Sequence, residues 1–248
     1  MVLSPPTFSL FDTVARISHG SVVPVDQNAD FSVDGPKVLA AAENARLTFL
    51  CSPDNPTGHT VPLDFLERVC DRTSGLVAWD EAYGEFWGET AVPLIDRYPN
   101  SVILKTFSKA LGLAGLRVGY LIGHLSIVAE LKKVNIPFNV NLMSHLTTLK
   151  LLDRPEWIVA QVDRILSERN RLFEAPRHPV GHGLSQRREF HPDPTPDGDG
   201  RVQRTAGRGH TRARPAEPHP LAEELPARHR RRTPDENEAL PRGCCIVW

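Results

Sequence analysis

Short apolar runs alternate with amphipathic segments along the first part of the chain. The runs SVVPV (21–25), RLTFLC (46–51), GLVAWD (75–80), SVILKT (101–106) and RVGYLIG (117–123) have the length and β-branched content of buried strands. Four further segments carry apolar residues at helical spacing: 63–73, 126–134, 141–152 and 156–173. This alternation predicts an α/β fold, a three-layer α/β/α arrangement around a mostly parallel sheet.

Polar residues follow the predicted strands where each strand ends. The run 46–51 leads into the turn SPDNPTG, the run 75–80 ends in an acid, and the run 101–106 ends just before a lysine. Ligands of parallel α/β sheets bind beyond the carboxyl ends of the strands. One edge of the sheet is therefore expected to hold an amide, a carboxylate, a phenol, an amine and two hydroxyls: Asn55, Asp80, Tyr83, Lys109, Thr106 and Ser108. Such groups suit a phosphorylated aromatic aldehyde.

Composition divides the chain near Ala175. Every lysine lies at or before Lys150, and Ile246 is the one isoleucine of residues 176–248, where Arg, Pro, Gly and His are frequent. So little aliphatic content can hardly offset the entropy of ordering a chain. We therefore predict a partial large domain over residues 1–175, and an aberrant, Arg/Pro-rich and disordered region over residues 176–248.

Charge and cysteine usage narrow the class of protein. The formal net charge of the 248 residues is −1, so no global charge attracts nucleic acid or a membrane surface. The four cysteines show neither metal-ligand spacing nor a disulfide framework, which is typical of a reducing compartment. No apolar run reaches the roughly 18 residues of a membrane helix, and no signal-peptide pattern opens the chain. A cytoplasmic protein that binds neither metal, membrane nor nucleic acid is expected.

Three segments, SPDNPTG, WDEAYGEF and TFSKALGLAGLRVGY, occur in this order over residues 3–175. They resemble the signature blocks of pyridoxal-phosphate aminotransferases of fold type I, classes I and II, and most closely the histidinol-phosphate branch. The resemblance implies the large domain of such a transferase and the cofactor pyridoxal 5′-phosphate. Several blocks in order are much more specific than a lone Ser-Lys pair.

The resemblance also implies a role for each residue. Lys109 would bond to the cofactor aldehyde and carry the proton of the substrate α-carbon, and Asp80 would face the pyridine nitrogen. Asn55 and Tyr83 would donate to the ring oxygen, with Tyr83 counted among the catalytic groups. Arg117, Ser108 and Thr106 would hold the phosphate, for which a guanidinium fork is well shaped, and Phe8 would stack on the ring.

Taken singly, each of these residues has an ordinary structural alternative. Lys109 could be a solvated loop lysine, Asp80 could cap a helix, and Asn55 lies in a turn sequence that is common in proteins of any function. Arg117 could be a surface arginine of a strand, and Phe8 could belong to the core. It is their order along one chain that favours the functional interpretation.

Two departures from the family accompany the resemblance. A long N-terminal segment, including a Gly-Ser-Asp type phosphate loop and an arm that reaches the partner subunit, is expected to be missing, so the chain is interpreted as truncated. Codons that could encode residues 181–194 can, when read one base downstream, encode a strand that resembles one of the family. The same is true of residues 225–231. The segment TPDENEAL (233–240) resembles the family in the present reading frame. These patterns indicate a frameshift near Ala175, partly reversed near Arg232, which the coding DNA would reveal.

The function implied by the resemblance is transamination, with histidinol phosphate as amino donor and 2-oxoglutarate as keto-acid acceptor, in a homodimer. Alternatives are another class I/II aminotransferase, a related decarboxylase of a phosphorylated amino acid, or a catalytically dead fragment. The dead fragment follows from the frameshift, since the arginines that would hold the substrate carboxylate and phosphate are then not encoded.

Overall fold

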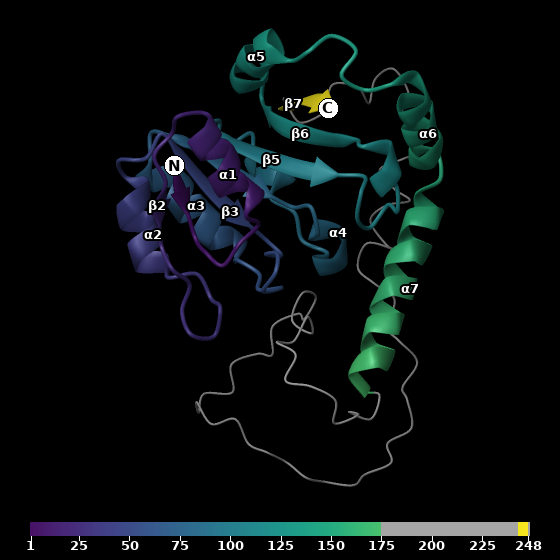
Figure 1. Ribbon diagram of the computed structural model, residues 1–248, viewed down its shortest axis with the longest axis horizontal. Helices are drawn as coiled ribbons and strands as arrows, with labels where there is room; N and C mark the ends of the chain where they lie inside the picture. Colours follow the sequence, from purple (N-terminus) through teal and green to yellow (C-terminus); the bar gives the residue numbers. More distant parts are fainter. Residues whose placement is uncertain (175–242, 248) are drawn as a thin grey trace, which may run out of the picture.

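The computed structural model describes residues 1–174 and 243–247, and its centre is a seven-stranded sheet (Figure 1). The strand order is β2-β1-β3-β4-β5-β6-β7, in which β1 to β5 are parallel, β6 is antiparallel to β5, and β7 is antiparallel to β6. The strands are β1 (Val2–Leu3), β2 (Val23–Pro24), β3 (Leu47–Cys51), β4 (Leu76–Asp80), β5 (Ser101–Thr106), β6 (Gly119–His124) and β7 (Gly243–Val247). The prediction of a mostly parallel sheet is confirmed.

Seven α-helices accompany these strands in the described residues: α1 (Leu10–Ile17), α2 (Gly35–Ala42), α3 (Leu63–Arg72), α4 (Gly84–Trp87), α5 (Leu125–Val134), α6 (Leu142–Leu152) and α7 (Pro155–Glu174). The four predicted helices are confirmed as α3, α5, α6 and α7, with no end shifted by more than one residue. Helices α1, α2 and α4 were not predicted, because short helices give little periodicity. Helix α2 instead begins with a local signal: Asp34 accepts a hydrogen bond from the Lys37 N–H at 3.2 Å.

Side chains of the central strand β4 alternate between two apolar layers. Val77 and Trp79 pack into the cluster that includes α2 and α3, whereas Leu76 and Ala78 pack with Val128 of α5. On this second face the Phe11 ring of α1 also lies 3.8 Å, centroid to centroid, from Phe49 of β3. Helices therefore cover both faces of the sheet, and the three-layer α/β/α prediction is confirmed.

A third apolar cluster supports the chain that follows β5. Phe107, Ala110, Leu111 and Val118 are buried against Ile158 and Val162 of α7, the long helix that runs down one side of the molecule in Figure 1. Residues 107–118 are thus held from behind by a rigid helix. This matters because the segment carries Ser108, Lys109 and Arg117.

The structure differs from the sequence predictions in two places. Arg117 does not lie on a strand: it follows a 3₁₀ turn (Ala114–Leu116) with a left-handed φ of 56°, and β6 begins two residues later. Most of the region predicted to be disordered, 176–242 and Trp248, lies outside the described residues. Gly243–Val247, within this region, forms β7 by backbone pairing with β6, a strand that the sequence pattern did not predict.

Candidate active site

The ends of β3, β4 and β5 lie side by side at one edge of the sheet. Cys51 pairs with Asp80, and Asp80 pairs with Leu104, so Asp80 lies between its two neighbouring strands. Backbone hydrogen bonds continue this contact past the strands, from the Ser52 N–H to Asp80 at 3.0 Å and from the Glu81 N–H to Leu104 at 2.9 Å. The loops after all three strands therefore start from one place, as the sequence predicts.

Lys109 and Tyr83 meet across this edge. The Lys109 Nζ lies over the Tyr83 ring, 5.0 Å from its centroid, a distance at which an ammonium is attracted to an aromatic face. Lys109 is exposed and follows β5, while Tyr83 is partly buried in the turn between β4 and α4. The structure thus brings together the amine and the phenol that the sequence predicts for the site.

Asp80 is a carboxyl whose charge is poorly compensated. Burial raises the pKa of Asp80 to about 6, and the nearby charges of Asp54 and Glu81 add to this rise. The Ala82 N–H, which donates to Oδ1 at 2.8 Å, and the charge of Lys109 lower the pKa, but by less. A protonated pyridine nitrogen carries both a positive charge and an N–H donor. Asp80 therefore fits the ring nitrogen of pyridoxal phosphate.

The candidate phosphate residues lie in the segment held by α7. The backbone pairing of β5 with β6 is extended by one hydrogen bond, from the Phe107 N–H to Val118 at 3.1 Å, so the segments that carry Ser108 and Arg117 leave the sheet together. Arg117 is exposed and donates to the Ala114 carbonyl at 3.0 Å. The Thr106 hydroxyl accepts from the Ser108 N–H at 3.1 Å and donates to Val118 at 3.4 Å, so it shapes the loop.

Asn55 and Phe8 lie on loops beside these groups. Asn55 is partly buried in the turn after β3, which is closed by hydrogen bonds between Asp54 and its neighbours His59 and Gly58 at 2.9 and 2.8 Å. Phe8 is exposed and packs edge to face against Phe11, at 5.4 Å between ring centroids. Within residues 1–174, neither side chain forms a hydrogen bond or ring contact with Lys109, so their predicted roles stay predictions.

The sequence analysis overlooked Asp54, which lies beside Asp80. Its buried carboxylate accepts hydrogen bonds from three side chains on separate segments: Thr7 at 2.5 Å, Thr57 at 2.9 Å and Gln27 at 3.4 Å. Burial raises the pKa of Asp54, and these donors only partly offset the rise. Asp54 thus joins the loop of Phe8 to the loop of Asn55. An acid in the turn after a buried strand was the signal that could have identified it.

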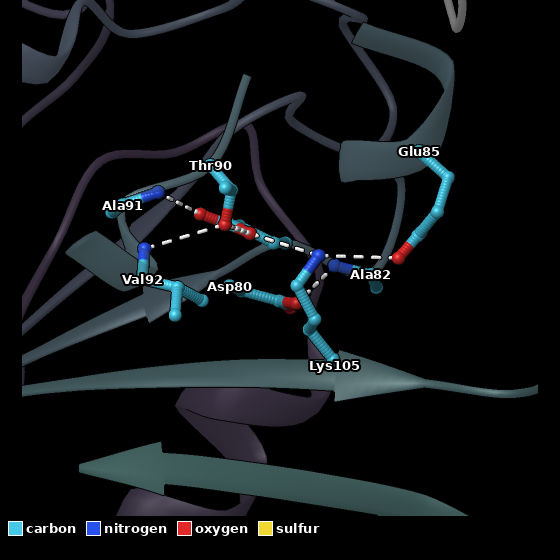
Figure 2. Close-up of polar contacts among 8 residues, drawn as sticks. Asp80, Ala82, Glu85, Thr90, Ala91, Val92 and Lys105 are labelled. Carbon is cyan, nitrogen blue, oxygen red and sulfur yellow. Dashed lines mark hydrogen bonds and ion pairs between the residues drawn. The ribbon is translucent and has the colours of Figure 1, made fainter. Parts of the chain in front are cut away.

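A buried ion-pair network lies behind the site and was also missed. Lys105 of β5 bridges Glu81 and Glu85 at 3.0 and 3.1 Å. Figure 2 shows its amine between Glu85 and the turn of Thr90 and Ala91. The sequence offered only a lysine in a strand and two acids in the next turn, without their pairing.

The described residues contain neither a candidate metal site nor a candidate membrane-spanning helix. Within 1–174 and 243–247, no group of histidine, cysteine or acidic side chains is arranged to hold a metal ion. In the same ranges, none of the helices combines the length and the apolar character needed to cross a bilayer.

An α/β/α sheet that carries a lysine, a carboxyl and a phenol at its strand ends is the arrangement expected of the large domain of a pyridoxal-phosphate transferase. The sequence profile of the family described as aminotransferase class I and II matches residues 1–185, and the chain belongs to this family. The match ends shortly after the point near Ala175 where the frameshift is inferred.

Similar proteins refine the placement within the family. Histidinol-phosphate aminotransferase of Thermococcus gammatolerans is 40% identical over 172 residues, which cover 69% of this chain and 50% of that protein. Histidinol-phosphate aminotransferase 2 of Bordetella bronchiseptica is 42% identical over 176 residues, covering 70% and 48%. The crystal structure of the Sinorhizobium meliloti histidinol-phosphate aminotransferase with pyridoxal 5′-phosphate superposes with a TM-score of 0.65 at 27% identity, covering 69% of this chain and 48% of that one. The chain spans about half the length of these relatives.

Proposed function

We propose that this chain binds pyridoxal 5′-phosphate at the carboxyl edge of its sheet, with Lys109 as the lysine that bonds to the cofactor aldehyde. The observation that carries the proposal is the meeting of Lys109, Tyr83 and Asp80 at the ends of β4 and β5. Membership of the aminotransferase family supports it. So does the crystal structure of the Sinorhizobium meliloti relative, which contains this cofactor.

The protein groups have separate tasks in this proposal. Asp80 accepts a hydrogen bond from the pyridine N–H and keeps that nitrogen protonated, while the Tyr83 and Asn55 side chains donate to the ring oxygen. Arg117 and Ser108 bind the phosphate, and the free Lys109 amine moves the proton from the substrate α-carbon. The bound cofactor supplies the electron sink that stabilises the carbanion formed at this carbon.

The reaction we propose for the whole protein is transfer of the amino group of histidinol phosphate to 2-oxoglutarate. The names of the Thermococcus and Bordetella relatives support this choice of substrate. For the chain as given, we expect cofactor binding with little or no turnover, because the inferred frameshift removes the arginines that would hold the substrate.

Covalent trapping tests the proposal directly. Titration with pyridoxal phosphate should give a saturable visible absorbance, and borohydride, which makes a lysine–cofactor bond permanent, should leave the label on Lys109 in peptide mass spectra. Lys109→Ala should abolish both signals. Lys133→Ala, which removes an exposed lysine paired with Glu130, should leave them intact. Labelling spread evenly over the surface lysines would overturn the proposal. Turnover of histidinol phosphate, assayed next, separates an active enzyme from a binding-only chain.

We also propose a cytoplasmic homodimer. The free thiols of Cys51 and Cys70 are buried, which suits a reducing compartment. Helix α6 exposes Leu142, Met143 and Leu146, an apolar face that a second copy of the chain could cover. Light scattering coupled to size-exclusion chromatography gives the mass in solution, and a monomer at micromolar concentration would exclude the dimer.

A further inference from the structure

Lys105 lies behind the candidate site, and its ion pairs are with Glu81 and Glu85, not with Asp80. Its side chain is 11% exposed, and its ammonium contacts Glu81 at 3.0 Å and Glu85 at 3.1 Å. A lysine buried in a strand of the sheet is rare unless it is paired. The pairing therefore needs a reason beyond solubility or surface charge.

The Glu81 carboxylate is fixed on every side. One oxygen accepts from the Thr90 hydroxyl at 2.7 Å and faces Lys105, while the other accepts from the Ala91 N–H at 2.6 Å. Only 1% of its side chain is exposed. These contacts join the 90–92 turn to β5 through Glu81, and Figure 2 shows Thr90 and Ala91 on one side of the Lys105 amine and Glu85 on the other. The ion pairs and hydrogen bonds of Lys105 and Glu81 thus connect four segments: the end of β4, the turn into α4, the turn at 90–92 and β5.

The two acids flank the residue that faces Lys109. Glu81 lies two positions before Tyr83 and Glu85 two positions after it, so Lys105 grips both ends of the turn that carries the phenol. The turn has no spare room: a Cβ on Gly84 would lie 3.0 Å from Cβ of Glu81 and 3.5 Å from Nζ of Lys105. The position of the Tyr83 ring is therefore coupled to the ion pairs beneath it.

The charge balance makes Lys105 difficult to replace. Burial alone lowers the pKa of Lys105, but Glu85 and Glu81 outweigh this and hold the pKa above the usual lysine range, so the ammonium stays charged. Without it, the largely buried carboxylates of Glu81, after β4, and Glu85, in α4, would lose their shared cation. Glu81 also raises the pKa of Asp80, so the acid that Lys105 holds is itself part of the electrostatic surroundings of the site.

We propose that Lys105 is a positioning residue, whose bridge to Glu81 and Glu85 holds the Tyr83 turn against β5 and so keeps the phenol and the Asp80 carboxyl in place relative to Lys109. This inference rests on the cofactor site proposed above. It assigns Lys105 no contact with cofactor or substrate.

Three variants test the bridge. Lys105→Met removes the cation, Lys105→Arg keeps it, and Glu85→Leu removes one arm while a neutral Lys105–Glu81 pair remains. Lys133→Met, at an exposed lysine paired with Glu130, is the matched control. We expect Lys105→Met and Glu85→Leu to raise the pyridoxal-phosphate dissociation constant by about tenfold, the scale of one charged hydrogen bond. In these two variants the pH midpoint of the bound cofactor's absorbance should also shift. In Lys105→Arg the dissociation constant and the pH midpoint should both stay at the values of the parent.

A cofactor-free measurement separates failure of this inference from failure of the site. Amide hydrogen exchange over residues 81–92 should become faster in Lys105→Met and Glu85→Leu, and stay unchanged in Lys133→Met. If the parent chain gives no cofactor band, the proposed function fails while exchange still reports on the bridge. If the parent binds and the folded variants keep its dissociation constant and pH midpoint, Lys105 has a structural role only and the inference is wrong. Should Lys105→Met fail to fold, Glu85→Leu decides alone.

Discussion

The Lys109 ammonium lies 5.0 Å from the centroid of the Tyr83 ring, although the two residues follow different strands. The contact exists because β4 and β5 are parallel neighbours with Asp80 paired to Leu104, so that the turns after them leave the sheet together. An exposed amine over an aromatic face is a modest attraction, about 0.5–1 kcal/mol. Its value lies in orientation, since it points the amine at the region that Asp80 and Tyr83 border.

The two parts of the Tyr83 side chain can be separated by mutation. Tyr83→Phe keeps the ring under Lys109 and removes the hydroxyl, whereas Tyr83→Leu removes both. We expect Tyr83→Phe to unfold at the same urea concentration as the parent, within about 0.5 kcal/mol, and to bind pyridoxal phosphate about tenfold more weakly if the phenol donates to the ring. Absorbance titration measures the affinity. Equal affinities for the parent and Tyr83→Phe would remove the phenol from the site.

The local pattern of the sequence predicts the main strands and the residues that end them. A buried run that stops at Asp80, or just before Lys109, is visible without any long-range information. The ion pairs of Lys105 are different, because several acids could pair with one strand lysine and only the packing of α4 selects Glu81 and Glu85. The left-handed φ of Arg117 likewise depends on how the preceding 3₁₀ turn meets β6.

Asp54 should couple two loops energetically. Thr7→Val and Asp54→Ala each remove the 2.5 Å hydrogen bond between them, and each should lower the free energy of unfolding. The double-mutant cycle should give a coupling of about 1–2 kcal/mol, typical of a hydrogen bond to a partly buried carboxylate. Thr13→Val removes an exposed bond to the Ser9 carbonyl and serves as control, with almost no effect. Additive effects of the Thr7 and Asp54 variants would contradict this coupling.

The pairing of β7 with β6 predicts a protected sheet edge. Deletion of 243–248 removes the strand that pairs from Gly243 to Val247 and leaves the outer groups of β6 to solvent. Amide exchange over Gly119–His124 should then become faster. Exchange over Leu47–Cys51, in the centre of the sheet, is the internal reference and should not change. Unchanged exchange in β6 would show that β7 does not protect it.

The raised pKa of Asp80 predicts how stability depends on pH in the cofactor-free chain. The carboxyl titrates at about 6 in the folded chain against an ordinary value of 3.8. Between these values the folded state binds more protons than the unfolded state, so this group's contribution to stability falls as pH rises from about 4 to about 6. Asp80→Asn carries no charge and escapes the penalty. It should therefore be more stable than the parent at pH 7 by at most about 3 kcal/mol, and the difference should vanish near pH 3.

Urea unfolding of the two proteins at pH 3.5 and 7 measures this difference, while the pH effects of groups that do not interact with Asp80 cancel. Adding pyridoxal phosphate at pH 7 should reverse the order, because a ligand that binds only the folded state stabilises it, and a pyridinium nitrogen gives the Asp80 charge the partner that the chain lacks. Asparagine cannot hold that nitrogen protonated, so the variant should gain much less. A variant that gained as much as the parent would show that the ring nitrogen does not face Asp80. The buried carboxyl would then need another explanation than cofactor binding.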